Sequence, residues 1–391
     1  MKEVPRTLSE LHSYVKTSSM TVAGMHVGEI TERPPLPVRE ATMAALDHDP
    51  LGYTEAGGIL ALRAHIARDI LERKGIPNCS PDHIVCCPGV KQGLFYVFRH
   101  LVKQMENLST GMEIILPSPY WGAYETQLRE LGVTVVPTPL TPEGTLDIEN
   151  IQTILTPRTR AIVLCTPHNP TGGILPKQNI MDLGDILPAH IKIISDEIYD
   201  GLDYEHCHTA VASILPTRTY TLGGFSKLYC MTGYRLGWIS TPTRKDAMEI
   251  TRLQANLCTC PNSLAQQTAL RLMESNYAAS DTVQKMVACL DRRRRELIAL
   301  FGSSIVGCPR GAFYIWIRVP DNQGIKDTSD SGPSSDLVLC MKLLETGVAI
   351  AAGSYFNCPG HIRISYACTE KDYEKGMSAF QKLSWIHCHS V

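Results

Sequence analysis

The sequence has little net charge and no long hydrophobic run. Its 37 lysine and arginine residues nearly balance its 39 aspartate and glutamate residues, which leaves a formal charge of −2. This balance does not favour binding to nucleic acid or to an anionic membrane. No apolar stretch approaches the roughly 18 residues of a membrane span, and the N-terminus has no apolar core of a secretory signal. We therefore expect a cytoplasmic protein without nucleic-acid or membrane partners.

Cysteine is plentiful, but the spacing typical of metal and redox motifs is missing. The 14 cysteines are scattered, and no two form a Cys-x-x-Cys pair. Cys86–Cys87, Cys258–Cys260 and the His-Cys-His runs at 206–208 and 387–389 are too close in sequence to share one tetrahedral ion without further ligands. We expect free thiols in a reducing compartment and no metal site.

The order of apolar and amphipathic segments predicts an α/β fold. At 391 residues, 44% of them hydrophobic, the chain is long enough for a large and a small domain. Between about residues 50 and 240, short apolar runs alternate with helical patterns, which favours a mostly parallel central sheet with helices on both faces. The predicted strands are HIVCCPG, MEIILPSP, VTVVPTPL, RAIVLCTP, IKIISDEIYD, TYTLGGFS and RLGWIS.

The remaining segments predict an N-terminal arm and a smaller α+β lobe. We expect helices near 7–17 and 38–46 and long helices over 262–301, followed by strands in GAFYIWIRV and HIRISYA. The expected division is an arm with part of the small domain at 1–45, a large domain at 46–285 and a small C-terminal domain at 286–391.

The stretch GGFSKLYCMTGYRLGW places one lysine, Lys227, after a predicted strand, with Arg235 eight residues later. A lysine becomes a nucleophile toward carbonyl groups when burial or neighbouring positive charge destabilises its ammonium form. A lysine at the end of a strand is more often simply solvated, so the residues around it decide between the two interpretations.

Other polar groups follow neighbouring predicted strands. Asp196 ends an apolar run, and Tyr199 follows it; Asp196 either caps a turn or keeps a heteroaromatic nitrogen protonated. Asn169 lies between prolines after another strand, in what is either a simple turn or a turn that presents its amide. Gly89 ends a third strand before a helix, whose first amides at Val90 and Lys91 are free to face an anion.

Taken in order, these motifs resemble those of the class I/II aminotransferases, which are fold-type I enzymes dependent on pyridoxal 5′-phosphate (PLP). The matching set is PGVKQ, SPYWGAY, HNPTGG, SDEIY, FSK followed by R-x-G, PRGAFY and RISYA, and it runs from about Tyr53 to Ala367.

The resemblance implies roles around the cofactor. Lys227 forms the aldimine with PLP and moves the substrate Cα proton, while Asp196 pairs with the pyridine nitrogen. Tyr199 and Asn169 bond the phenolic oxygen of the ring, and Trp121 stacks on it. The phosphate is bound by Arg235, with the amides of Gly89, Val90 and Lys91, and with Ser226 in reach.

The resemblance also implies a substrate site and an assembly. Arg363 binds the substrate α-carboxylate, with Asn169, Trp121 and Gly28 nearby. A tyrosine in the position of Tyr53 reaches the phosphate of a neighbouring subunit, so a homodimer with shared active sites is implied.

The chain departs from the family pattern at two places. Gly224 replaces a serine that many members have three residues before the lysine, and Ser226 is an alternative phosphate contact. The N-terminal segment reads Gly28-Glu29-Ile30-Thr31 rather than Gly-Glu-Pro-Asp, which leaves substrate choice open. We interpret the preceding His26, and Tyr314 in GAFY, as packing residues first and as substrate contacts second.

The first functional hypothesis is an aminotransferase of amino-acid biosynthesis, which exchanges an amino group between an α-amino acid and a 2-oxo acid. The alternative keeps PLP but performs elimination, replacement or ring closure, as 1-aminocyclopropane-1-carboxylate synthases do. A third, non-catalytic regulator is disfavoured, since no DNA-binding extension precedes residue 20. Side-chain specificity stays open: Lys91 or Arg252 is a possible second cation for a dicarboxylate.

Overall fold

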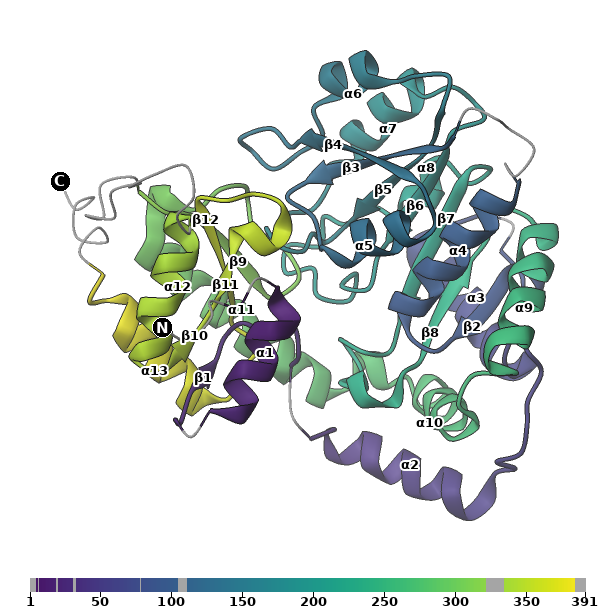
Figure 1. The fold of residues 1–391 in the computed structure, drawn as a ribbon. Helices are drawn as coiled ribbons and strands as arrows, with labels where there is room; N and C mark the ends of the chain where they lie inside the picture. Colours follow the sequence, from purple (N-terminus) through teal and green to yellow (C-terminus); the bar gives the residue numbers. More distant parts are fainter. Residues whose placement is uncertain are drawn as a thin grey trace.

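The computed structural model describes residue 5 and residues 7–18, 20–30, 33–77, 79–104, 111–320 and 334–383. Figure 1 shows two parts, a large α/β layer structure and a smaller lobe built from the C-terminal residues and the N-terminal arm. The long helix α11, Asp281–Phe301, belongs to the smaller lobe and leads into it from the large one.

A seven-stranded sheet forms the centre of the large part. Its strand order is β2-β8-β7-β6-β5-β3-β4, and all neighbours are parallel except β8, which runs antiparallel to both β2 and β7. The fold class predicted from the sequence is therefore confirmed, and each of the seven predicted apolar runs forms one strand. The bounds are β2 Ile84–Cys87, β3 Glu113–Ser118, β4 Thr134–Pro139, β5 Thr159–Cys165, β6 Lys192–Asp196, β7 Thr219–Gly224 and β8 Gly237–Ser240.

Helices cover both faces of this sheet, because successive side chains of a strand point to opposite sides. In β3, Ile114 packs in one apolar cluster with α4, α5 and α9, whereas Ile115 packs in another with α6, α7 and α8. The bounds of the helices in the large part are α2 Leu36–His48, α3 Leu60–Lys74, α4 Val90–Gln104, α5 Ala123–Glu130, α6 Ile148–Ile154, α7 Lys177–Ile186, α8 Val211–Ile214, α9 Arg244–Cys258 and α10 Ser263–Glu274.

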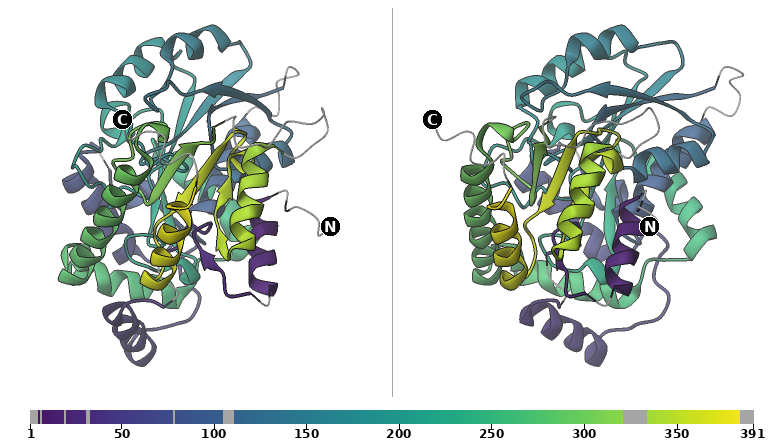
Figure 2. Two further views of the ribbon diagram at one scale, coloured as in Figure 1. Left: turned by 90° about the vertical axis from the view of Figure 1, so that its left-hand side faces the viewer. Right: turned by 60° about the vertical axis from the view of Figure 1, so that its left-hand side comes forward.

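The smaller lobe contains the antiparallel sheet β11-β12-β9 and a two-stranded parallel pair, β1 with β10. Figure 2 shows α11, α13, α12 and α1 gathered on the outer side of these strands. The N-terminal arm thus joins the lobe formed by the end of the chain. The bounds are α1 Leu8–Thr17, β1 Ala23–Gly24, β9 Tyr314–Arg318, α12 Ser335–Glu345, β10 Val348–Ala349, β11 Ala351–Ala352, β12 His361–Ser365 and α13 Glu370–Phe380.

The residue boundaries of the predicted domains stay a prediction. The long helical stretch predicted at 262–301 divides into α10 and α11, with a short 3₁₀ turn at Tyr277–Ala279 between them. The side chains of Asn262 and Ser280 accept hydrogen bonds from the first-turn amides of α10 and α11, which explains why two separate helices start there. Within the described ranges, no helix has both the length and the apolarity that crossing a bilayer requires.

Candidate active site

The candidate site lies where three neighbouring parallel strands end. Asp196 is the last residue of β6 and pairs in register with Cys165 of β5 and Leu222 of β7. Asn169 follows β5, and Lys227 follows β7, so the loops after these strands bring both side chains to the same edge. The carboxyl edge of such a sheet is where ligands of α/β proteins bind.

A cavity of about 250 Å³ opens at this edge. It collects side chains from the large part, from the N-terminal arm and from the smaller lobe, so residues far apart in sequence meet there. The predicted site residues that line it are Gly28, Val90, Lys91, Trp121, Asn169, Asp196, Tyr199, Ser226, Lys227, Arg235 and Arg363. Two further predicted site residues, Gly89 and Tyr53, do not line it.

Lys227 lies in this cavity without a carboxylate partner in the described part of the chain. Its Nζ donates a hydrogen bond of 2.6 Å to the carbonyl oxygen of Gly28 and lies 5.8 Å from the centre of the Tyr199 ring. Burial lowers the pKa of Lys227 to about 8, partly opposed by the charge of Glu29 and reinforced by that of Arg235. The amine is therefore neutral in a larger fraction of molecules near neutral pH than an exposed lysine is.

Asp196 is buried and receives two hydrogen bonds. The hydroxyl of Tyr124 donates to Oδ2 at 2.8 Å, and the amide of Ile198 donates to Oδ1 at 3.3 Å. Burial raises the pKa of Asp196 to about 6, while these hydrogen bonds act in the opposite direction. A buried carboxylate held in one orientation is suited to pairing with a cationic group of a ligand.

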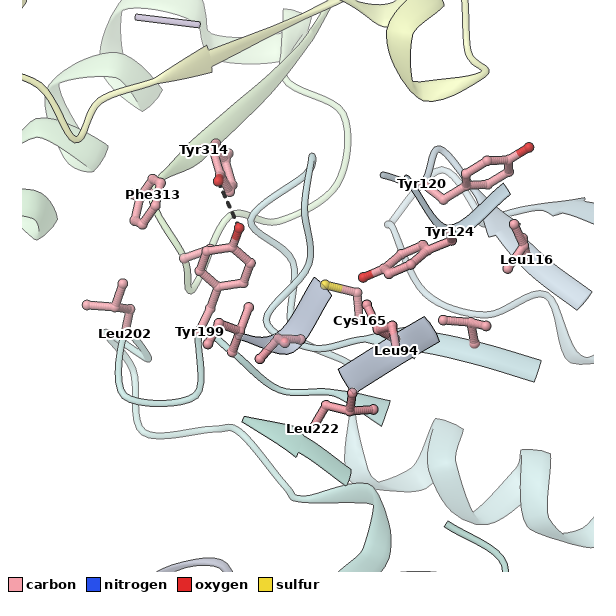
Figure 3. Packing of buried hydrophobic residues seen from close by; sticks show 14 of the residues in the cluster. Leu94, Leu116, Tyr120, Tyr124, Cys165, Tyr199, Leu202, Leu222, Phe313 and Tyr314 are labelled. Carbon is pink, nitrogen blue, oxygen red and sulfur yellow. Dashed lines mark hydrogen bonds between the residues drawn. The ribbon is translucent and has the colours of Figure 1, made fainter. Parts of the chain in front are cut away.

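Tyr124 is a contact that sequence reasoning missed. It lies in α5, three residues after Trp121, and the two rings meet edge to face with centroids 5.5 Å apart. Figure 3 shows its hydroxyl pointing toward Cys165 at the strand edge. The signal was the spacing of three residues in SPYWGAY, because Trp121 lies in the turn that leads into α5 and Tyr124 lies in its first turn.

Tyr199 and Tyr314 form a buried hydroxyl pair. Their hydroxyl oxygens are 2.8 Å apart, and Figure 3 shows this bond between the large part and β9 of the smaller lobe. Burial raises the pKa of both tyrosines, so both stay protonated at neutral pH. Tyr314 is buried, as packing requires, but it also lines the cavity and leaves no space for a Cβ at Gly28.

Arg363 is 1% exposed and has no ion pair with a carboxylate among the described residues. It donates to Asn169 Oδ1 at 2.9 Å and to the carbonyl oxygen of His26 at 2.5 Å, and its Nε has no hydrogen-bond partner. Its guanidinium also lies 4.4 Å from the centre of the Tyr314 ring. Burial lowers its pKa, although a guanidinium stays charged. An uncompensated buried cation of this kind is suited to binding an anionic group of a ligand.

Arg235 and the first turn of α4 form a second place for an anion. Gly89 follows β2 with a φ of +84°, and it lies so close to Arg235 that a Cβ there would collide with the guanidinium. The helix that starts at Val90 has first-turn amides without acceptors inside the helix. A cation facing the start of a helix is a favourable arrangement for a phosphate group.

The backbone around Gly224 explains why this position holds glycine and not the serine named in the sequence analysis. It pairs with Gly237 across β7 and β8, and a Cβ at position 224 would lie 2.9 Å from the Gly237 Cα. A backbone atom in that position has little room to move. Ser226 is buried and lines the cavity, so its hydroxyl is the one that this part of the chain offers.

Tyr53 lies outside the cavity and is 90% exposed. Within one chain it therefore has no contact with Arg235 or with the first turn of α4. Its predicted role depends on a second subunit. Among the described residues, no group of three or more His, Cys, Asp or Glu side chains is arranged to bind a metal ion.

Comparisons with known proteins agree with this geometry. Residues 21–380 match the model of the family described as Aminotransferase class I and II. The aspartate/prephenate aminotransferase of Thermus thermophilus is 31% identical over 376 residues, covering 94% of this chain and 92% of that protein.

Solved structures give the same result. The aspartate aminotransferase from Thermus thermophilus with maleate has a TM-score of 0.85 and 29% identity, and the match covers 97% of both chains. The aromatic aminotransferase from Pyrococcus horikoshii has a TM-score of 0.83 and 28% identity, and the match covers 96% of this chain and 98% of that one. These matches extend over both lobes and over the N-terminal arm.

Proposed function

This chain belongs to the class I and II aminotransferase family, and from this premise we propose which residues perform its reaction and which substrate it takes. It is a PLP-dependent transferase that moves an amino group between an α-amino acid and a 2-oxo acid. The observation that carries the residue assignment is the meeting of Lys227, Asp196 and Arg363 in one cavity, each without an ion-pair partner of its own among the described residues.

The residues in the cavity fit the cofactor. Lys227 is a primary amine with a lowered pKa, as condensation with an aldehyde requires. Asp196 is a buried carboxylate that matches a protonated ring nitrogen. Gly89 lets the Arg235 guanidinium pack against the start of α4, and a cation beside first-turn amides matches a phosphate group.

Bound PLP supplies an electron sink that stabilises negative charge at the substrate Cα. Lys227 holds and moves the proton at that carbon as general base and then general acid. Asp196 would pair with the ring nitrogen and favour its protonated form. Tyr199 and Asn169 would hold the phenolic oxygen by hydrogen bonds, and Trp121 would contribute an aromatic wall to the cofactor site.

Arg363 binds the α-carboxylate of the substrate. Without substrate, its two terminal nitrogens donate to Asn169 Oδ1 and to the His26 carbonyl oxygen, and its Nε–H has no acceptor. A carboxylate that accepts two parallel hydrogen bonds would orient the Cα–H bond toward Lys227. Gly28, which also lines the cavity, lets the Tyr314 hydroxyl pack against it.

The substrate we propose is an acidic amino acid of the aspartate type. Lys91 lines the cavity, has no ion pair in the described residues, and its Nζ lies 5.1 Å from the centre of the Trp121 ring. It is therefore placed to bind the second carboxylate of a dicarboxylate. Arg252, the other candidate cation, does not line the cavity. The names of the relatives, which include aspartate, support this choice.

We further propose a cytoplasmic homodimer that serves amino-acid biosynthesis. Several apolar side chains of α2, of the loop before α3 with its first residue, and of α9 are exposed, as residues of a subunit interface are in a single chain. Tyr53 stands among them, where a second subunit would receive it. These exposed side chains are Leu36, Met43, Leu46, Leu51, Tyr53, Leu60, Met248 and Leu257.

The elimination, replacement and ring-closure alternative has less support. Those reactions need the same cofactor contacts, so the site geometry does not separate them from transamination. The relatives and structures named above are aminotransferases, and transamination is accordingly the reaction we assign.

The test is a half-reaction. PLP-loaded protein is mixed with aspartate and no acceptor; we expect one equivalent of 2-oxo acid per chain and conversion of the cofactor to its amine form, reversed by adding a 2-oxo acid. Borohydride reduction before the reaction should attach the cofactor to the peptide that contains Lys227. Repeated product release with the cofactor left in its aldehyde form would show a lyase instead.

A further inference from the structure

Tyr314 lines the catalytic cavity as the first residue of β9, but the roles proposed above leave its hydroxyl unused. It is 1% exposed, and its neighbour Phe313 is buried as completely. Both rings therefore satisfy packing. The hydroxyl is the group in which the two residues differ, so its contacts decide whether Tyr314 does more than pack.

The two consecutive residues Phe313 and Tyr314 both contact the ring of Tyr199. They meet it edge to face, with ring centroids 5.5 and 5.6 Å away and interplanar angles of 84° and 83°. Only Tyr314 adds a hydrogen bond, in which the two hydroxyl oxygens are 2.8 Å apart (Figure 3). The ring contacts fix where Tyr199 lies, whereas the hydrogen bond fixes the rotation of its hydroxyl.

The direction of this hydrogen bond follows from the number of hydrogens. A tyrosine hydroxyl has one hydrogen to donate and accepts with its lone pairs. Since Tyr199 is proposed to donate to the phenolic oxygen of the cofactor, Tyr314 must donate to Tyr199 in the loaded enzyme. Burial raises the pKa of both tyrosines, so both hydrogens are present at neutral pH. A donor that itself accepts a hydrogen bond is polarised and donates more strongly.

The ring of Tyr314 contacts a second group of the site, the guanidinium of Arg363. Arg363 pairs with Trp316 across β12 and β9, so Tyr314, two residues before Trp316, is its diagonal neighbour on the same face of the sheet. The guanidinium carbon lies 4.4 Å from the centre of the Tyr314 ring and 4.7 Å from that of Phe356. Ring faces attract a cation without occupying its N–H donors, which stay available for a carboxylate.

We propose that Tyr314 is a positioning residue for two groups at once: its hydroxyl orients the hydroxyl of Tyr199, and its ring orients the guanidinium of Arg363. This inference rests on the proposed function and deepens it. Tyr199 belongs to the large part, whereas Tyr314 and Arg363 belong to the smaller lobe. The smaller lobe therefore sets the direction of a hydrogen bond that the large part donates.

The substitution Tyr314→Phe isolates the hydroxyl, because it keeps the ring and removes one oxygen atom. Other titratable groups lie near the hydroxyl pair, and the substitution leaves all of them in place. These groups are Cys165, Asp196, Lys227 and Arg363. A changed titration of the bound cofactor in this variant is therefore assigned to the lost hydrogen bond.

The first test is a spectral titration of PLP-loaded protein, in which the absorbance of the bound cofactor gives its pKa. A hydrogen bond donated to the phenolic oxygen favours the deprotonated, more negative form, so weakening this bond raises the pKa. We expect Tyr199→Phe to raise it by about one pKa unit and Tyr314→Phe by roughly a third of that. In the double variant, Tyr314→Phe should add nothing to Tyr199→Phe, because it acts through the missing hydroxyl.

Tyr366→Phe is the matched control. Tyr366 is a buried tyrosine of the smaller lobe that does not line the cavity, and its hydroxyl donates to the carbonyl oxygen of Ala312 at 3.4 Å. Removing this hydroxyl should change the urea midpoint of the cofactor-free protein and leave the pKa of the bound cofactor as in the wild type. A purely structural role of Tyr314 would give the same pattern.

The second test concerns the ring and measures the affinity of PLP-loaded protein for succinate, a dicarboxylate that has no amino group to transfer. Tyr314→Phe keeps the ring and should leave this affinity within about twofold of the wild type. Tyr314→Leu removes the ring and should lower the affinity about fivefold, the scale of one cation–π contact. Should Tyr314→Leu not fold, the spectral titration of Tyr314→Phe decides the proposal alone.

Two outcomes of the titration would overturn the proposal: an unchanged cofactor pKa in Tyr314→Phe, or the same change whether or not Tyr199 is present. Wild-type affinity for succinate in a folded Tyr314→Leu would overturn the part that concerns Arg363. In each case the wild type would still complete the half-reaction with aspartate. Wild-type protein that binds PLP and gives no half-reaction would instead refute the proposed function.

Discussion

Two lysines, Lys74 and Lys227, show how neighbouring groups shift the pKa of the same side chain in opposite directions. At the end of α3, the Nζ of Lys74 lies 2.9 Å from Glu197 Oε2 and 2.8 Å from Asp200 Oδ2. Burial lowers its pKa, but these carboxylates outweigh burial and the pKa is raised. Lys227 has no such partner, and its pKa falls to about 8.

The carboxylates near the two lysines are neighbours in sequence. Asp196 faces the catalytic cavity, whereas Glu197 turns away from it toward Lys74 and accepts further hydrogen bonds from the Ser195 hydroxyl and the Val211 amide. The alternation of side chains at the end of β6 thus separates a structural ion pair from a reactive site. The comparison shows that the pKa of a lysine here depends on whether carboxylates contact its amine, and not on burial alone.

The largest effect is expected from Lys227→Met, which keeps the volume of the side chain and removes the amine. The half-reaction with aspartate should slow by at least about 10³-fold, because the proton at Cα loses its acid and base. Stopped-flow absorbance of the loaded cofactor measures the rate. A variant with near wild-type speed would remove Lys227 from the mechanism.

Next in size is Lys74→Met, which leaves Glu197 and Asp200 buried without their cation. Breaking a buried ion pair from one side costs about 3–5 kcal/mol, so the urea midpoint should fall strongly. The exposed Lys177→Met is the matched control and should change stability by less than about 0.5 kcal/mol. Adding Glu197→Gln to Lys74→Met should restore part of the loss; a fully additive double variant would contradict the pairing.

The same substitution at Lys227 should act in the opposite direction on stability. In cofactor-free protein the folded pKa of about 8 lies below the ordinary value of 10.5, so the charged form is disfavoured by folding. That shift corresponds to at most about 3 kcal/mol, less solvent screening at this partly buried side chain. Lys227→Met should therefore be more stable than the wild type at pH 7.

The pH dependence gives the sign of this effect. Between pH 8 and 10.5 the unfolded chain binds more protons at Lys227 than the folded chain does, so wild-type stability rises with pH there. The difference between wild type and Lys227→Met should shrink across that window. A difference that stays constant up to pH 10.5 would show that the ammonium of Lys227 is not disfavoured.

The smallest effect is expected from Tyr124→Phe. Loss of the 2.8 Å hydrogen bond leaves Asp196 Oδ2 with one donor fewer, and the pKa of Asp196 should rise further above its present value of about 6. A shift of about one pKa unit, or tenfold in the ionisation equilibrium, is the scale of such a bond. Two measurements report this change: the pH titration of the bound cofactor's absorbance and the dissociation constant of the cofactor. If neither value changes in the variant, the Tyr124 hydroxyl does not influence the pKa of Asp196.

Much of the fold and of the site could be predicted from the sequence. Apolar runs that are buried on both faces leave a clear pattern, and side chains just after parallel strands meet at one edge, which is why Asp196, Asn169 and Lys227 were found together. The Tyr124–Asp196 and Tyr199–Tyr314 pairs could not be predicted, because they depend on how α5 and the smaller lobe dock. Tyr53 depends on a surface outside the single chain.

The N-terminal arm occupies donors that a substrate needs. The carbonyl oxygens of His26 and Gly28 accept hydrogen bonds from Arg363 and Lys227. An arriving carboxylate competes with the arm for the same guanidinium, so occupancy of the pocket and attachment of residues 23–30 are coupled in a single exchange. Amide hydrogen exchange along this short segment should consequently change when a carboxylate enters or leaves the pocket.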